Sequence, residues 1–286
     1  MEQPPLVEEY IEDLSTFLTD DDRAVRLTTA KLFVTVAESL PRSVLPAVEA
    51  LADRLADDEE FYYVRARAAE ALGYVALESP AAVTDPATLA DLRIGLSFDE
   101  PAVKRKLAKA LTHVALGDPG RLRHHADSLA VHLDDEDELV RYHLSTTLVV
   151  IACAFPDALT EAAGPLSERL TDPNPYVAGR AAEALGVLAP AGIEADAAPD
   201  IEEIEAIEAS HESPPAFLTD RLAFYRGQVD SPSEPVDGLG TVSAVREGLE
   251  AVVEEMRTPA DETCPSCGFE LPDDGPPMCP RCGIPR

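Results

Sequence analysis

A fivefold internal repeat constrains the fold of this chain more than any other feature of its sequence. Successive repeats are 39, 39, 37 and 37 residues apart. Five positions after each alignment point stands a small residue, and eight positions after it a large apolar one, which places both on one face of a helix. A period in this range is typical of stacked helical units. The alignment points are Val25, Val64, Val103, Val140 and Val177.

Proline and acidic residues divide each repeat into two helices. Before each valine runs a second amphipathic segment that ends in an acidic turn, and after each valine a proline ends the helix and admits the next one. One such pair of helices cannot cover its own apolar face, so the pairs must stack around a continuous core. We therefore expect an all-α fold, an α-solenoid. The prolines are Pro41, Pro80, Pro119, Pro156 and Pro190.

The repeats resemble the HEAT-repeat family, whose units carry an acidic turn, a Val-Arg-like pair opening the second helix and an Ala-rich face. The forms in this chain are "VRARAAEALGYVA" and "VAGRAAEALGVLA", and the resemblance covers about residues 5–190. It implies about five HEAT-type helix pairs, with the second helices lining a concave surface that usually binds a partner. It does not name that partner, because a fold does not determine a function.

Composition divides the chain into four parts. We expect the solenoid over residues 1–192, acidic capping helices over 193–230, a linker with an amphipathic helix over 231–260, and a zinc ribbon over 261–286. In "DIEEIEAIEA", three isoleucines share one side of a helix that would close the end of the core. The helix at about 240–257 has a short coiled-coil seam. We favour packing of this seam within the chain, and self-association into a dimer is the alternative.

The C-terminal segment contains the pattern C-x2-C-x11-C-x2-C, formed by Cys264, Cys267, Cys279 and Cys282. Two Cys-x-x-Cys turns can supply four sulfurs in the tetrahedral arrangement that Zn²⁺ accepts. The segment resembles the short zinc ribbons at the ends of many archaeal and bacterial proteins, and iron is the competing metal. Four thiolates leave no open position, so the zinc is expected to be structural. We interpret the fifth cysteine, Cys153, as a small buried hydrophobe.

Acidic residues outnumber basic ones 54 to 23, and the formal net charge is −31. This imbalance is typical of a halophilic, archaeal cytoplasm with molar salt, where repulsion among carboxylates is screened. An acidic protein from a mesophile is the alternative. Uniform binding to DNA phosphates or to an anionic membrane is disfavoured in either case. The chain has no long apolar stretch and no signal peptide at its start, so we expect a cytoplasmic location and no membrane partner.

Positive charge gathers on the second helices of repeats two to four. On the expected concave face, Arg67, Lys106, Lys109 and His143 occupy positions that contacts between repeats do not require, and we predict a partner-binding groove there. The remaining cations of interest stand one residue after their valines, and we interpret them as a ladder that pairs with neighbouring acidic turns. They are Arg26, Arg65, Lys104 and Arg141.

These features predict a non-enzymatic adaptor or scaffold that binds a protein through its concave face, with the zinc ribbon as a second contact. The alternative is a factor that binds RNA or the ribosome through the ribbon and the groove. An enzyme is the least favoured reading. The HEAT-like hydroxylases hold iron with several His-Glu pairs, and this chain has one, His211-Glu212, outside the repeats.

Overall fold

The computed structural model describes part of the chain and divides it into two compact units, Met1–Arg246 and Glu247–Arg286. Each unit is described by itself. The described residues are 10–193, 206, 214–231, 238–256, 264, 269, 278, 279 and 281–284. The isoleucines Ile201, Ile204 and Ile207 of the expected capping helix lie outside this part of the chain.

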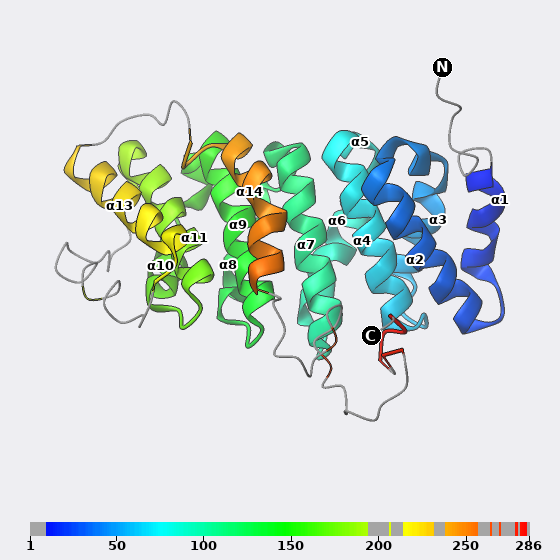
Figure 1. Ribbon diagram of the computed structural model, residues 1–286. Helices are drawn as coiled ribbons and strands as arrows, with labels where there is room; N and C mark the ends of the chain where they lie inside the picture. Colours follow the sequence, from blue (N-terminus) through cyan, green and yellow to red (C-terminus); the bar gives the residue numbers. More distant parts are fainter. Residues whose placement is uncertain are drawn as a thin grey trace, which may run out of the picture. The chain divides into compact units, whose positions relative to one another are not determined.

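Five long helices, one from each repeat, form the layer that we call the second-helix layer. They lie side by side in chain order (Figure 1). In every one of them the valine that aligns the repeats is the third residue, so the repeat period and the helix starts agree. The α-solenoid prediction is confirmed. The helices are α2 (Arg23–Ser39), α4 (Tyr62–Glu78), α7 (Pro101–Gly117), α9 (Glu138–Ala154) and α11 (Pro175–Leu188).

The other layer, the first-helix layer, is built from short α-helical and 3-10 pieces. Prolines start several of these pieces, and each proline lacks the amide that a continuous helix would use. The result is one broken helix per repeat, packed on the second helix of the same repeat. The pieces are α1 (Ile11–Ser15), η2 (Thr16–Thr19), η3 (Pro41–Ala47), α3 (Val48–Ala56), α5 (Pro80–Val83), α6 (Pro86–Ile94), η4 (Gly95–Ser97), η5 (Pro119–Arg121), η6 (Arg123–His125), α8 (Ala126–Ala130), η7 (Val131–Asp134), η8 (Pro156–Leu159), α10 (Ala163–Glu168) and η9 (Arg169–Thr171).

The acidic turns between the two layers start the second helices. The side chain of Asp22 accepts a hydrogen bond from the amide of Ala24, and that of Asp137 accepts from the amides of Leu139 and Val140. Such caps satisfy amides that the first helical turn leaves without partners. The acidic residues that mark the turns in the sequence therefore also fix where the helices begin.

Small residues let neighbouring second helices approach closely. A Cβ atom on Gly73 of α4 would lie 2.7 Å from the Cα atom of Ala110 in α7, which is too close for any side chain. In the same way, α13 (Ala216–Asp230) places Phe217 against Gly179 of α11. The short η10 (Ala189–Ala191) follows α11, and α13 then covers this last repeat. α13 lies within residues 193–230, where capping helices were expected.

The helix expected at about 240–257 is α14 (Val242–Met256), which starts in the first unit and continues into the second. Its seam residues Val245, Leu249 and Val252 are buried. No helix in the described part of the chain has both the length and the apolar character needed to cross a bilayer.

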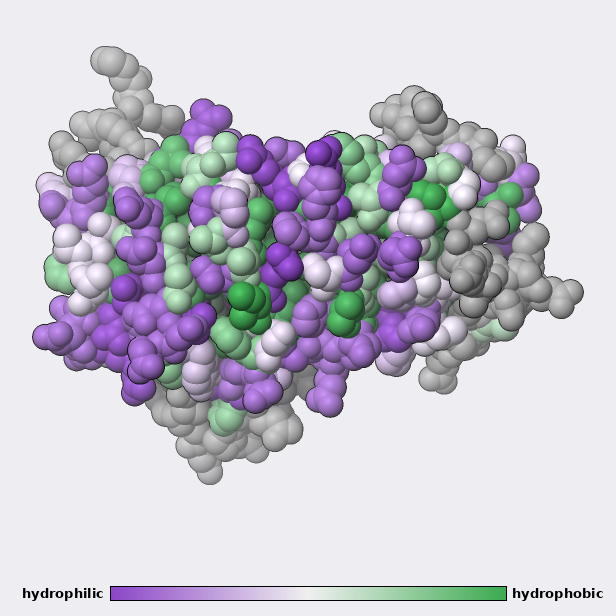
Figure 2. All heavy atoms as spheres, turned by 180° about the vertical axis from the view of Figure 1, so that it is seen from behind, coloured by the Kyte–Doolittle hydropathy of each residue, from purple (hydrophilic) through white to green (hydrophobic). Residues whose placement is uncertain are grey.

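The side of the molecule opposite to the view of Figure 1 is largely hydrophilic (Figure 2). Hydrophobic residues appear there as separate spots among polar ones. Two large apolar side chains on the first-helix layer, Ile94 and Val131, are more than half exposed. Scattered apolar residues of this kind are normal on a protein surface and do not make a docking face.

Candidate partner-binding face and metal centre

Basic side chains at the start of the second helices bind the acidic turns of the following repeat. Arg26 donates through Nε to Glu60 at 2.6 Å and through Nη2 at 2.9 Å. Arg141 donates to both carboxylate oxygens of Asp172, at 2.7 and 2.9 Å. Two parallel bonds to one carboxylate fix the geometry of the pair as well as its charge. Lys104 pairs with Asp135 across the next interface. This confirms the predicted ladder at three of its four positions.

The fourth position uses a different contact. Arg65 donates to the carbonyl of Leu55 at 2.9 Å and pairs with Asp58, both within its own repeat. Toward the following repeat it instead lies over the ring of Phe98, 4.9 Å from the centroid. The guanidinium therefore still links two repeats, through a cation–π contact in place of an ion pair.

A second set of polar contacts joins the second helices through the middle of their length. Glu70 of α4 accepts from Arg67 on the same helix at 2.8 Å and from Lys106 on α7 at 2.7 Å. Burial alone would raise the pKa of the Glu70 carboxyl, but the charges of Lys106 and Arg67 outweigh it and lower the pKa to about 2. Glu70 is therefore a charged bridge between repeats two and three.

The same set continues in both directions along the layer. Lys109 donates to the hydroxyl of Tyr74 at 2.8 Å, and that hydroxyl donates to Glu38 at 3.0 Å. On the other side, Thr112 donates to the carbonyl of His143 at 3.0 Å. Successive partners are 31 to 36 residues apart. We call the set the polar row: Glu38, Arg67, Glu70, Tyr74, Lys106, Lys109, Thr112 and His143.

All four predicted groove residues belong to the polar row. The structure brings Arg67, Lys106, Lys109 and His143 onto one layer, as expected, but they are only 9, 8, 4 and 1% exposed. The expectation that contacts between repeats do not require these positions is wrong for Lys106, Lys109 and His143, which bond across the interfaces, whereas Arg67 bonds to Glu70 on its own helix. Sequence reasoning missed the partner role of Glu70, although Glu70 precedes Lys106 by 36 residues, one repeat length.

A buried cluster closes the polar contacts at the end of the solenoid. Glu183 of α11 accepts from Arg180 at 2.7 Å, from Arg221 of α13 at 2.8 Å and from the amide of Gly240 at 3.1 Å. Arg180 also donates to the hydroxyl of Tyr142 at 3.1 Å. Burial opposes ionisation of Glu183, yet the two guanidiniums outweigh it and lower its pKa. We call these residues the Glu183 cluster.

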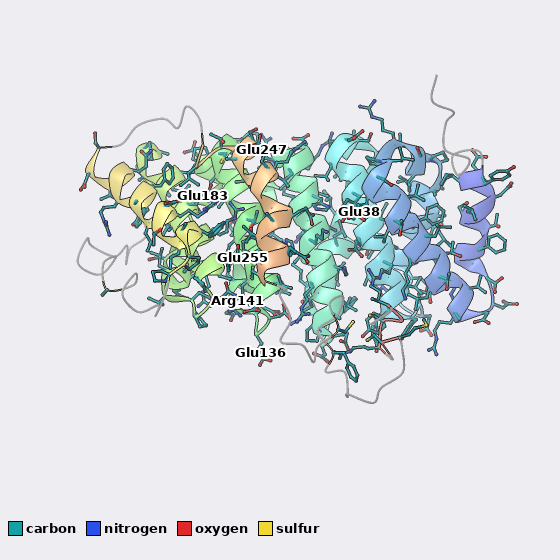
Figure 3. All side chains as sticks on the ribbon, viewed as in Figure 1. Glu38, Glu136, Arg141, Glu183, Glu247 and Glu255 are labelled. Atoms are coloured by element: carbon teal, nitrogen blue, oxygen red, sulfur yellow. The ribbon has the colours of Figure 1, made fainter. Side chains whose placement is uncertain are left out.

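Figure 3 labels one member of each set of contacts: Arg141 of the ladder, Glu38 of the polar row and Glu183 of the Glu183 cluster. Arg141 and Glu136 lie at the same end of α9, where the guanidinium also donates to the Glu136 carbonyl at 3.0 Å. Glu38 and Glu183 come from the second helices of the first and last repeats. The polar contacts thus extend over the whole second-helix layer.

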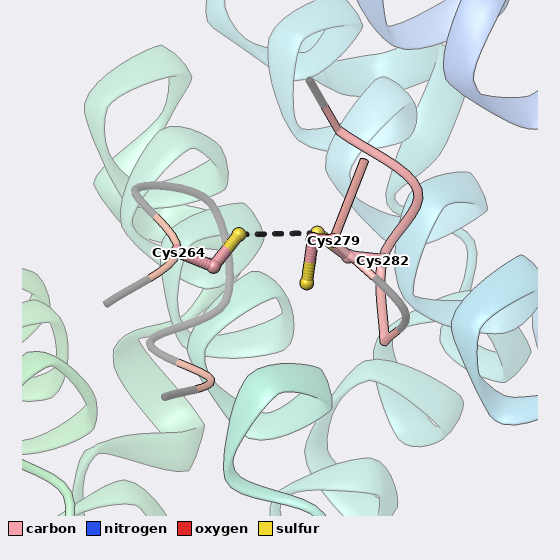
Figure 4. Close-up of side chains that lie close together, drawn as sticks. All are labelled: Cys264, Cys279 and Cys282. Atoms are coloured by element: carbon pink, nitrogen blue, oxygen red, sulfur yellow. Dashed lines mark hydrogen bonds between the residues drawn. The ribbon is translucent and has the colours of Figure 1, made fainter. Parts of the chain in front are cut away.

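In the second unit, three cysteines form a group with the geometry of a metal site. The sulfurs of Cys264, Cys279 and Cys282 lie within 4.8 Å of one another (Figure 4). Those of Cys264 and Cys282 are 3.5 Å apart. Sulfurs at ~2.3 Å from one tetrahedral zinc ion are about 3.8 Å apart, so the spacing suits a bound ion. Cys267 lies outside the described residues.

The backbone around these cysteines forms tight turns. The amide of Cys264 donates to the Phe269 carbonyl at 2.9 Å, and the amide of Cys279 donates to the Ile284 carbonyl at 2.8 Å. Gly283 closes the second turn with a φ of 69°, a conformation that favours glycine. Among the residues that the structure describes, these cysteines are the one group able to ligate a metal, and the histidines form none.

Comparison with known proteins supports the fold. No family model matches the chain, and no curated protein shows significant sequence similarity to it. An engineered protein of known structure is similar with a TM-score of 0.64 and 20% identity, over 78% of this chain and 97% of the other. A designed armadillo repeat protein has a TM-score of 0.59 and 18% identity, over 77% and 99% of the two chains. Another, solved in complex with the peptide (KR)4, has a TM-score of 0.60 and 16% identity, over 77% and 99%.

Proposed function

We propose that this protein is a non-enzymatic scaffold whose second-helix layer binds a protein partner, with a structural zinc ribbon as a second contact. The observation that carries the proposal is the polar row. Apolar side chains of similar volume would hold the repeats together at least as well, because the desolvation of buried charges offsets much of their attraction. A row of charges retained on one layer across four repeats therefore indicates recognition.

The fold supports this role. Two of the similar solved structures are designed armadillo repeat proteins, and one of these was solved with a bound peptide. In such solenoids each repeat adds one unit to an extended surface, so a partner can contact several repeats at once. In this chain the row contains the cations Arg67, Lys106 and Lys109. We propose that the partner supplies carboxylates to these cations, in a segment rich in Asp and Glu.

Nucleic acid is the alternative partner, and it is less well supported. Phosphate binding relies on exposed cations that release counterions. The formal net charge of the chain is −31, so its excess of carboxylates repels a long phosphate backbone outside the polar row. We therefore favour a protein partner over nucleic acid. We further propose that the chain is monomeric and acts in a cytoplasm with molar salt.

Binding by the neutralised variant Lys106→Gln/Lys109→Gln tests this function. We expect a fluorescent Glu-rich peptide to bind the wild type in molar KCl, and the double variant to bind it at least ten times more weakly. The matched control is Lys104→Gln, on the same helix but in the ladder, and it should keep the affinity. Thermal unfolding of each variant establishes that it is folded. Equal affinity of the wild type and the double variant contradicts the proposal, and preferential binding of oligouridylate favours the alternative.

Zinc is the metal that we assign to the cysteines. Thiolates at this spacing suit its tetrahedral coordination, and Cys267 would complete a closed site with no position for a substrate. We expect one zinc per chain by elemental analysis, and a loss of that zinc in Cys279→Ser. Visible absorption bands of an iron–thiolate centre in the purified chain would contradict the assignment.

A further inference from the structure

Residues Gly238–Arg246 form a segment of the first unit that crosses the second-helix layer, and we call it the strap. It follows α13 in the chain and includes the first five residues of α14. Its hydrogen bonds reach three consecutive repeats, at Glu183 on α11, Cys153 on α9 and Leu116 on α7. A chain segment that crosses neighbouring repeats in this way lies as a peptide ligand would lie on a solenoid.

The first attachment is made by backbone atoms. The amide of Gly240 donates to Glu183 at 3.1 Å, and its carbonyl accepts from the thiol of Cys153 at 3.2 Å. Burial, together with the charge of Glu183, raises the pKa of Cys153 to about 12, so the thiol keeps the proton that it donates. The amide and the carbonyl of Gly240 are therefore both hydrogen-bonded, and the backbone of another peptide could make the same two bonds.

The second attachment uses an arginine at a helix end. Arg246 donates to the carbonyl of Leu116, in the last turn of α7. Carbonyls in this turn lack partners within the helix, and the negative end of the helix dipole favours a cation there. The strap thus ends on a site that is specific for positive charge.

A hollow of about 500 Å³, open to the surface on one side, lies beside the strap. Ala152, Val187 and Pro190 line it together with Gly240, Thr241 and Val242 of the strap, so an apolar side chain placed there would contact both. The strap also contains Gly238 and Gly240 at φ values of 90° and 77°, so its backbone can turn where other residues could not.

We propose that the strap is a displaceable intramolecular ligand, and that the surface beneath it receives a partner peptide of the same chemistry. Such a peptide offers a backbone amide to Glu183, an apolar side chain to the hollow, and an arginine six residues later to the end of α7. In this chain's own sequence the arginine is followed by Glu247, Glu250 and Glu254. A partner with the same order of residues would carry an arginine followed by the acidic segment of the proposed function. For the choice of the second-helix layer, this inference rests on that proposed function.

The test uses the full chain and a labelled peptide with the strap sequence GLGTVSAVR. The variant Arg246→Ala removes the strap's hold on α7. We expect the peptide to bind this variant at least ten times more tightly than the wild type, because the peptide no longer competes with an attached strap. A peptide with alanine in place of its arginine should lose this affinity. Arg42→Ala, an exposed position in the second repeat, is the matched control and should behave as the wild type.

The rate at which Cys153 is alkylated, followed by mass spectrometry, is an independent measure of how often the strap leaves the second-helix layer. This rate should rise at least tenfold in Arg246→Ala and fall again when the strap peptide is added. If Arg246→Ala does not fold, Gly240→Pro replaces it as the test. This variant lacks the amide that donates to Glu183, so its peptide affinity and its rate of Cys153 alkylation should also rise.

Peptide affinities and alkylation rates that match those of the wild type in both variants would show that the strap is a fixed part of the fold. This result leaves the proposed function standing if the Glu-rich peptide still binds through Lys106 and Lys109. Failure of that separate assay would overturn the proposed function itself.

Discussion

Buried charges in this protein are held by partners on their own helix and on the elements packed against it. Glu183 has no exposed surface, and it accepts from two guanidiniums and one amide. A carboxylate in such a place would be neutral without the arginines. Arg180 is just as buried, so removal of Glu183 leaves the charge of Arg180 without its carboxylate.

Replacing Glu183 by alanine should therefore destabilise the solenoid strongly. Removal of one partner from a buried pair costs about 3–5 kcal/mol, because the other charge stays buried. Urea unfolding followed by circular dichroism measures the change. The control is Arg42→Ala, which breaks the pair of Arg42 with Glu78, two side chains that are 74% and 48% exposed. It should change stability by less than about 1 kcal/mol. Equal effects of the two substitutions would contradict this account.

Glu70 makes stability depend on pH in the acid range. Burial raises its pKa, but Lys106, Arg67 and Lys109 lower it from the ordinary 4.5 to about 2. Since the folded pKa is the lower one, the stabilisation is present above pH 4.5 and is lost as the pH falls toward 2. A shift of this size corresponds to about 3 kcal/mol.

The variant Glu70→Gln separates this contribution from that of other carboxylates. We expect the wild type to be more stable than the variant by about 3 kcal/mol above pH 5, and this difference to shrink between pH 4.5 and 2. Urea unfolding at half-unit steps of pH measures it. A difference that is constant over the whole range would show that Glu70 acts by packing and not by charge.

The sequence predicted the helices of the second-helix layer more completely than any other feature. Each repeat valine is the third residue of its helix, because one periodic pattern determines both the apolar face and the position of the acidic turn. The broken first helices were not predicted. Prolines such as Pro46 and Pro86 could be seen in the sequence, but whether a proline ends, kinks or starts a helix depends on the layer below it.

The candidate site was predicted in part, for a related reason. The offsets within a repeat placed Lys106 and Lys109 on the correct layer. They did not reveal that Glu70 and Tyr74, about one repeat earlier, would bond them, because the rotation between repeats decides which side chains meet. The three cysteines of the candidate metal centre were the easiest to recognise, since a Cys-x-x-Cys turn is local in sequence.

The glycine on α4 offers a test of the packing between helices. A Cβ atom at position 73 would meet the backbone of α7 at Ala110, so Gly73→Ala must push the two helices apart. We expect a loss of about 1–3 kcal/mol. Gly227→Ala on α13 is the matched control, because a Cβ atom there meets nothing within 4 Å. It should gain about 0.5–1 kcal/mol from helix propensity. Stabilisation by both substitutions would contradict the close approach.

The charge of the whole molecule acts on all repeats together. The 54 carboxylates outnumber the 23 Lys and Arg side chains, so more than half of the carboxylates cannot each have a basic side chain of their own. The acidic turns gather part of this charge along one edge of the layers, where the ladder neutralises some of it. The repulsion that is left opposes the compact state, and salt reduces it as the Debye length falls from about 10 Å at 0.1 M to about 3 Å at 1 M.

The midpoint of thermal unfolding should therefore rise with salt. Between 0.1 and 2 M KCl we expect an increase of roughly 5–10 °C, which corresponds to about 2–3 kcal/mol for a domain of this size. The variant Asp21→Asn/Glu59→Gln/Glu136→Gln removes three exposed carboxylates from the turns of repeats one, two and four and should show a smaller increase. Sucrose, which stabilises by exclusion from the surface, should raise both midpoints equally. A chain whose midpoint is the same at both salt concentrations would not be adapted to molar salt, and the acidic composition would then need another explanation.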